Sequence, residues 1–81
     1  MTKKEALEVK LPNFIVKDCW EGFVEMRYSI KKPLTGRSCQ LIFNKLKSID
    51  ESMANEILDQ STMNCWQGIF PLKEELDRKD W

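Results

Sequence analysis

The sequence predicts an all-α fold, a compact domain of three helices closed by an aromatic hook at its C-terminal end. Two observations predict this fold. Apolar side chains recur at helical spacing in three successive stretches, and residues typical of helix ends separate those stretches. Because the chain has 81 residues, it has room for one domain with a limited core. We expect that domain over residues 13–72, with a charged tail over 73–81 that has room for a short fourth helix.

Residues 1–12 are expected to form a flexible arm, whose last few residues have the option of lying extended on the domain. Leu7, Val9 and Leu11 alternate with charged residues in this segment, and Pro12 stops any helix that begins before it. The functional alternative to a frayed terminus is a docking strand that adds to a partner's sheet.

A first helix is predicted from Asp18, as its N-cap, to Lys31 or Lys32. Its apolar side carries four residues: Trp20, Phe23, Val24 and Tyr28. Arg27 lies seven residues after Trp20 and therefore falls within this apolar side. Since an unpaired buried guanidinium is costly, we expect Arg27 to pair with a carboxylate or to lie on an aromatic ring, which is a structural role. A phosphate contact is the alternative.

A second helix is predicted from Gly36 to Lys47. Pro33 ends the preceding helix, Thr35 caps the new one, and Leu34 precedes the cap as an apolar staple. The predicted buried stripe consists of Leu41, Ile42 and Leu46. The opposite, exposed stripe has residues spaced by three and four: Arg37, Gln40, Asn44 and Lys47.

The third helix is predicted to start at a capping box, with Ser48 as the cap and Glu51 three residues on, and to end near Met63. Asn64 is then the expected left-handed residue that ends the helix. Two large aromatic residues follow on either side of a glycine, and their burial predicts that they fold back as the hook: Trp66 and Phe70.

The segments IKKPLT (residues 30–35) and ILDQSTMNCWQGIFPLK (residues 57–73), together with Trp20, Arg27 and Leu46, carry a family resemblance. They resemble the small C-terminal helical region of bacteriophage and prophage replication proteins of the initiator and helicase-loader type. The resemblance covers about residues 11–73, and Cys65 stands where that family usually has Gly. It implies a place in phage DNA replication without defining an activity, since in most relatives this region is attached to a larger protein.

The residue types present do not favour catalysis or metal binding. The chain has no His, and its three cysteines are far apart: Cys19, Cys39 and Cys65. We therefore expect no metal site, no cofactor and no enzyme activity, because neither a zinc-binding pattern nor a base for a thiol nucleophile is present. The free thiols, the charged N-terminus and the lack of a run of about 20 apolar residues predict a cytoplasmic protein without a membrane segment.

The charge is polarised along a chain that has no net charge overall. The segment from Lys17 to Lys47 is basic, and the segment from Ser48 to Trp81 is acidic. This distribution and the residue types of the second helix predict DNA binding through six residues: Lys31, Lys32, Arg37, Gln40, Asn44 and Lys47. The alternative is a protein-interaction module that docks on, or inhibits, a host or phage protein. In that reading three residues form an adaptable contact patch: Met26, Phe43 and Met63.

Overall fold

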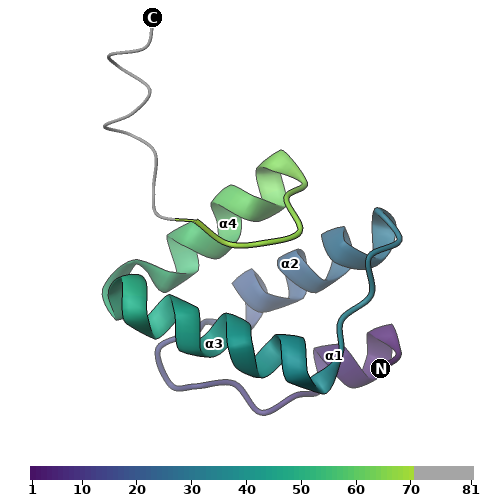
Figure 1. Ribbon diagram of the computed structural model, residues 1–81, viewed down its shortest axis with the longest axis horizontal. Helices are drawn as coiled ribbons and strands as arrows, with labels where there is room; N and C mark the ends of the chain where they lie inside the picture. The colour runs from purple at the N-terminus through teal and green to yellow at the C-terminus, as the bar shows by residue number, and fades with distance from the viewer. Residues whose placement is uncertain (71–81) are drawn as a thin grey trace, which may run out of the picture.

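The computed structural model describes residues 1–70, and in this part of the chain the fold is all-α with no strand, as predicted (Figure 1). Its elements are α1 (Lys3–Leu7), α2 (Lys17–Ser29), α3 (Gly36–Asp50), the 3-10 turn η1 (Glu51–Met53) and α4 (Ala54–Asn64). α2 packs on both α4 and α1, and α3 packs on α4 and η1. The three predicted helices correspond to α2, α3 and α4. The predicted tail over 73–81 and its fourth helix lie outside the described residues.

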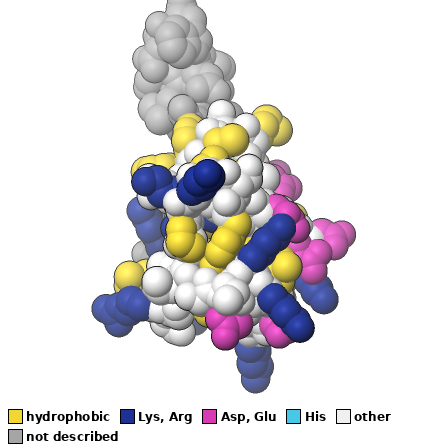
Figure 2. Space-filling view, turned by 90° about the vertical axis from the view of Figure 1, so that its right-hand side faces the viewer, with side chains coloured by type: hydrophobic (Ala, Val, Ile, Leu, Met, Phe, Trp, Pro, Cys, Tyr) yellow, Lys and Arg dark blue, Asp and Glu magenta, His cyan; other side chains and the backbone are white. Residues whose placement is uncertain are grey.

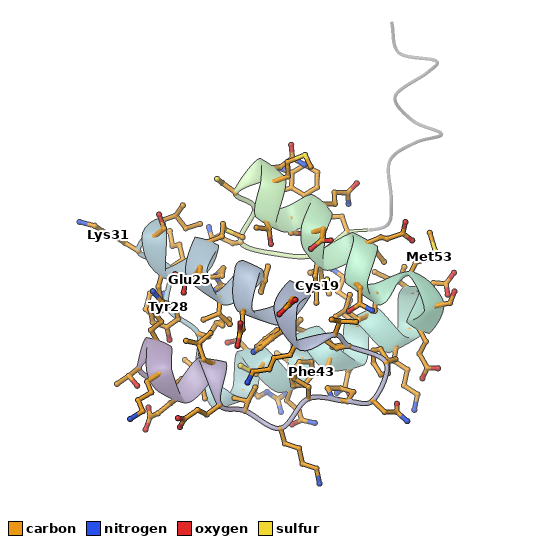
Figure 3. All side chains as sticks on the ribbon, turned by 180° about the vertical axis from the view of Figure 1, so that it is seen from behind. Cys19, Glu25, Tyr28, Lys31, Phe43 and Met53 are labelled. Carbon is orange, nitrogen blue, oxygen red and sulfur yellow. The ribbon has the colours of Figure 1, made fainter. Side chains whose placement is uncertain are left out.

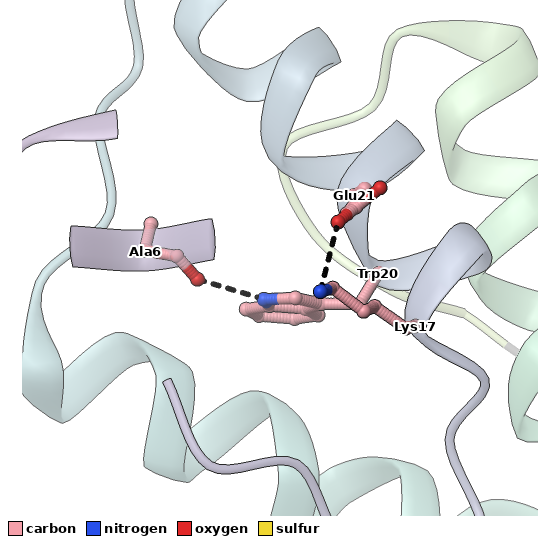
Figure 4. Close-up of polar contacts among 4 residues, drawn as sticks. All are labelled: Ala6, Lys17, Trp20 and Glu21. Carbon is pink, nitrogen blue, oxygen red and sulfur yellow. Dashed lines mark hydrogen bonds and ion pairs between the residues drawn. The ribbon is translucent and has the colours of Figure 1, made fainter. Parts of the chain in front are cut away.

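Trp20 lies at the centre of the core and is fully buried. Its ring centroid lies 5.8 Å from that of Phe23 on the same helix and 5.0 Å from that of Phe43 on α3. The indole Nε1 donates a hydrogen bond of 2.9 Å to the carbonyl oxygen of Ala6 (Figure 4). The core role predicted for Trp20 is confirmed, and the same side chain joins α1, α2 and α3.

The prediction that residues 1–12 form a flexible arm is wrong for its first half. Thr2 and Glu5 form a capping box, since each side chain accepts a hydrogen bond from the other's backbone N–H. Ala6 is fully buried, and the Tyr28 hydroxyl donates to the carbonyl oxygen of Met1 at 2.7 Å. A five-residue helix is too short to be stable alone, so the contacts of Trp20 and Tyr28 hold α1 in place.

The cap of α3 is confirmed, whereas the predicted cap of α2 is wrong. The Thr35 hydroxyl accepts a hydrogen bond of 3.0 Å from the backbone N–H of Ser38, and Leu34 before it is fully buried. α2 begins at Lys17 after Val16, whose side chain makes no capping bond. Asp18 therefore lies in the first turn, where its negative charge favours the positive end of the helix dipole.

Two predictions about α3 are corrected. Leu41, predicted to be buried, is 50% exposed. Cys39 is buried in its place, in one stripe with Ile42 and Leu46. The spacing explains the change, because residues 39, 42 and 46 follow the three-and-four repeat of one helix face, whereas Leu41 is one position off it. The capping box of Ser48 is also absent, since α3 continues to Asp50.

A sharp turn at η1 connects α3 to α4. The Asp50 side chain accepts hydrogen bonds from the backbone N–H of Ser52 at 3.0 Å and from its hydroxyl at 2.7 Å. The cap that begins this region is therefore Asp50, two residues later than the predicted one. The short polar side chain fixes the turn locally, as expected of an aspartate before a helical turn.

α2 and α4 end in the same way, with a left-handed residue that is not glycine. At the end of α2, Lys31 has a φ of 62°, and the N–H of Lys32 donates to the carbonyl oxygen of Arg27 at 2.9 Å. At the end of α4, Cys65 has a φ of 57°, and the N–H of Trp66 donates to the carbonyl oxygen of Ser61 at 3.0 Å. Both are Schellman motifs. The prediction that Asn64 is the left-handed residue is wrong, because Asn64 is the last residue of the helix.

Arg27 connects the two helix ends. Its guanidinium donates hydrogen bonds of 2.8 Å to the Lys32 carbonyl, 2.8 Å to the Gln67 carbonyl and 3.4 Å to the Pro33 carbonyl. The group also lies 5.9 Å from the ring centroid of Phe23. Desolvation by burial lowers the pKa of Arg27, but arginine keeps its proton in proteins. The expected contact with an aromatic ring is confirmed, whereas backbone carbonyls replace the expected carboxylate.

The hook after α4 is present, but the residue that it buries differs from the prediction. Ile69 is 2% exposed, whereas Phe70 is 46% exposed. The Ser61 hydroxyl donates to the Gly68 carbonyl at 2.8 Å and so fixes the returning chain. Trp66 is half-buried and packs edge-on against Phe70, with ring centroids 5.4 Å apart. The two aromatic residues therefore cover the outside of the hook, and Ile69 fills its inside.

Cys65→Gly is expected to stabilise the domain. A residue with a side chain in the left-handed region costs about 1–2 kcal/mol, part of which is offset by the greater chain entropy of glycine in the unfolded state. Because Cys65 is exposed, the change removes little packing. The free energy of unfolding should rise by up to about 1 kcal/mol, which raises the Tm by about 4–8 °C per kcal/mol in a domain of this size. Cys65→Val should lower the Tm. A lower Tm for the glycine variant would contradict the assignment.

Arg27→Lys is expected to lower the free energy of unfolding by about 2–4 kcal/mol. An ammonium group lacks the planar fork that reaches three carbonyls, and the loss of part-buried hydrogen bonds from a charged donor is costly. Urea denaturation measures the change, and Arg37→Lys is the matched control because Arg37 is exposed. An unchanged urea midpoint for Arg27→Lys would show that these hydrogen bonds do not hold the helix ends.

Candidate nucleic-acid interface

The six residues predicted to contact nucleic acid are all exposed. Arg37, Gln40, Asn44 and Lys47 lie along the solvent-facing side of α3, as their spacing predicts. The separation of seven positions between Gln40 and Lys47 corresponds to about 10 Å along the helix axis. We call this row of four residues the α3 stripe.

A groove runs beside the α3 stripe. It has a volume of about 360 Å³. Its lining consists of Lys10, Leu11, Pro12 and Phe14 on one side and Gln40, Phe43, Asn44 and Lys47 on the other. Residues 10–14 belong to the segment that connects α1 to α2, which runs along α3 in Figure 1. The groove therefore combines three residues of the α3 stripe with a second wall from a distant part of the chain.

Asn55 of α4 holds the second wall in place. Its side-chain oxygen accepts a hydrogen bond of 2.7 Å from the N–H of Val16, and its side-chain nitrogen donates one of 3.1 Å to the carbonyl oxygen of Phe14. The side chain of Ile15, between these two residues, is buried in the core. At the other end of the segment, the hydrogen bond from Trp20 fixes the carbonyl of Ala6. Both ends of the wall are therefore attached to the core of the domain.

The structure does not bring all six predicted residues to the groove. Lys31 extends from the end of α2 (Figure 3), and neither Lys31 nor Lys32 lines the groove. Arg37 lies one helical turn before Gln40 and outside the lining. The six predicted residues therefore fall into three parts. Gln40, Asn44 and Lys47 line the groove, Arg37 lies next to it, and Lys31 and Lys32 lie at the turn before α3.

The bases of α3 have little competing negative charge on their own helix. α3 contains three bases, Arg37, Lys45 and Lys47, and its acid, Asp50, is its last residue. Within residues 1–70 the structure has two ion pairs, Lys3 with Glu25 at 2.7 Å and Lys17 with Glu21 at 3.7 Å. Neither uses a base of α3. Figure 2 shows acidic side chains gathered at the right and bottom of its view, while the Lys and Arg side chains at the left have no acid beside them.

Sequence reasoning missed the groove residues that lie outside the α3 stripe. Lys10, Leu11 and Pro12 were assigned to the flexible arm, although the alternation of apolar residues up to Leu11 is a signal that one side of this segment packs on the domain. Phe14 had no assignment. Phe43 was assigned to a Met-rich contact patch, which the structure does not form as predicted, because Met26 is buried.

Two of the three cysteines have thiols with raised pKa values. Cys39 is buried, and burial raises the pKa of its thiol. Burial also raises the pKa of Cys19, whose Sγ lies 3.7 Å from a carboxylate oxygen of Asp59, and this carboxylate raises it further. A raised pKa keeps a thiol protonated and unreactive. Cys65 is exposed at the end of α4.

Residues 1–70 contain no cluster of three or more Cys, Asp or Glu side chains that could hold a metal ion. None of the helices in residues 1–70 is long and apolar enough to cross a membrane.

The geometry defines a small all-α domain with a solvent-facing groove. The groove lies between the basic helix α3 and the segment from α1 to α2, which hydrogen bonds with Asn55 hold in place. The family model of the YdaU C-terminal domain matches residues 12–80, which is most of the chain. The chain therefore belongs to the YdaU C-terminal domain family, which is associated with phages and prophages. The phage part of the resemblance is thus confirmed. No curated protein and no solved structure matches the chain.

Proposed function

We propose that this domain binds DNA through the solvent-facing side of α3, as a non-enzymatic accessory of phage or prophage DNA replication. The observation that carries the proposal is the groove, in which Gln40, Asn44 and Lys47 of the α3 stripe lie together with Lys10. Two separate segments thus place two positive charges and two amides around one hollow.

The chemistry of these side chains suits nucleic acid. Lysine and arginine neutralise phosphates, which supplies most of the affinity of such interfaces. Asparagine and glutamine can bond both donors and acceptors on base edges. Arg37, Lys47 and Lys10 are all exposed and none of them takes part in the two ion pairs within residues 1–70, so their charges remain open to phosphates.

The role in replication rests on the resemblance together with the family. The IKKPLT and ILDQS segments resemble the C-terminal region of phage replication proteins, and the YdaU C-terminal domain family is associated with phages and prophages. A domain of this kind would add DNA affinity to a replication complex without catalysing a step. This assignment is by analogy with the family, and the groove supports its DNA-binding part.

A second candidate function, docking on a protein, is favoured by a different surface. Leu41 is 50% exposed on α3, and Lys45, one turn later, lies with its Nζ 5.4 Å from the ring centroid of the exposed Phe70. Met63, at the end of α4, is 83% exposed. Exposed apolar side chains that gather into one patch are typical of surfaces that contact another protein.

Replacing Arg37 and Lys47 together by Glu is expected to abolish DNA binding and to leave the fold intact, because both side chains are exposed. Fluorescence anisotropy with single-stranded and duplex DNA at two salt concentrations measures the affinity. Wild-type binding should weaken as salt rises, and each phosphate contact removed should reduce the slope of log K against log salt by about one unit.

The matched control replaces Lys4 and Lys17 by Glu, which changes the net charge equally at exposed positions outside the groove. This control should retain most of the affinity. Equal loss in both double variants would show that overall charge, and not the α3 stripe, determines binding. A wild-type domain that binds no DNA at low salt, but binds a purified replication protein, would replace DNA binding by protein docking.

A further inference from the structure

We propose that the groove holds an unpaired base, so that the nucleic acid that the domain prefers is single-stranded. This inference rests on the proposed DNA binding and specifies its ligand. It is carried by the composition of the groove, which combines two aromatic side chains, two amides and two lysines: Phe14, Phe43, Gln40, Asn44, Lys10 and Lys47.

The fold holds both aromatic side chains of the groove in place. Phe43 is half-buried with its ring centroid 5.0 Å from that of Trp20, which fixes it against the core. Phe14 is also half-buried, and Asn55 hydrogen-bonds its backbone. A base that stacks on such a ring does so without ordering a mobile side chain, and stacking on aromatic residues is the main source of affinity for single strands.

The polar groups are placed to accept the rest of a nucleotide. Gln40 and Asn44 stand one turn apart on α3, and both are exposed at the groove. Their amides match the donors and acceptors on the edge of an unpaired base. Lys10 comes from one wall and Lys47 from the other, so that phosphates on either wall meet a positive charge.

The shape of the groove favours a single strand over a duplex. Its volume of about 360 Å³ lies in the range of about 300–1,000 Å³ typical of sites for small molecules, which suits a base and not a double helix. A base in a duplex is already stacked and paired, and extracting it costs several kcal/mol, whereas a base in a single strand is free to leave the stack. Leu11 and Pro12 add an apolar part to the lining of the groove. Contacts with phosphates alone would not need these apolar residues.

The test compares the affinity of the full chain for three probes in fluorescence anisotropy at low salt. The probes are a thymine oligonucleotide of about 12 nucleotides, the same backbone with abasic sites, and a duplex of the same length. We expect the thymine oligonucleotide to bind about tenfold more tightly than the abasic strand, the effect of one stacked base. The duplex should bind more weakly than the thymine oligonucleotide. A 2-aminopurine placed in the strand should change its fluorescence on binding.

Two variants assign the effect to the groove. Phe14→Leu keeps an apolar side chain but removes the ring, and should lower the affinity for the thymine oligonucleotide about tenfold while leaving the affinity for the abasic strand unchanged. If this variant fails to fold, Gln40→Ala, at an exposed position, should reduce the same preference. Lys4→Ala, outside the groove, is the control and should change neither affinity.

The outcomes separate this inference from the proposed function. If the abasic strand or the duplex binds as tightly as the thymine oligonucleotide, and Arg37 and Lys47 are still required, the domain binds DNA by its phosphates and the base site is overturned. A preference for the thymine oligonucleotide that survives both Phe14→Leu and Gln40→Ala would also overturn it. If none of the three probes binds at low salt, both the base site and the proposed function fail.

Discussion

The rest of this structure depends on the hydrogen bonds of Arg27. They join three segments: the end of α2, the connection from α2 to α3, and the chain that follows α4. A single guanidinium donates to the carbonyls of Lys32 and Pro33, which connect α2 to α3, and of Gln67, which follows α4. Both helix ends adopt Schellman motifs with a non-glycine left-handed residue. Such ends are less favourable than glycine ends. We infer that the arginine compensates for this cost by satisfying carbonyls that the two turns leave without a partner.

Fixing these ends also determines the direction of α3. The carbonyls of Lys32 and Pro33 lie directly before the buried Leu34 and the cap residue Thr35, so the start of α3 follows from the position of Arg27. From that start, the positions of Cys39, Ile42 and Leu46 face the core. The opposite side of α3 then faces solvent, and the α3 stripe lies on it. Arg27, in the last turn of α2, thus helps to position the start of the helix that carries the α3 stripe.

The outline of the fold could be predicted from the sequence because it depends on local patterns. The apolar spacing located α2, α3 and α4, and Thr35 and Leu34 marked the start of α3. The seven-residue spacing from Trp20 placed Arg27 on the buried side of α2. These features need only the periodicity of a helix and the chemistry of its ends.

Most errors come from competing local signals, and one comes from a distant contact. Asn64 is a better left-handed residue than Cys65, yet the hydrogen bonds that end α4 place the turn at Cys65. Lys10 and Phe14 were not predicted to form one wall of a groove, because the bond that fixes this segment, from Asn55 to Phe14, joins residues 41 positions apart. The position of this segment beside α3 could therefore not be predicted, whereas the α3 stripe, which belongs to one helix, could be.

The central claim is that the domain contacts nucleic acid with α3 and the segment pinned beside it. The most direct measurement is an NMR titration of the isotope-labelled chain with a single-stranded oligonucleotide, which follows each backbone amide. We predict that the amides of residues 10, 11, 13, 14 and 37–47 shift together and saturably, and that those of the hook, residues 65–69, do not. Shifts confined to the hook, or no shifts along α3 at an oligonucleotide concentration that saturates binding, would contradict the claim.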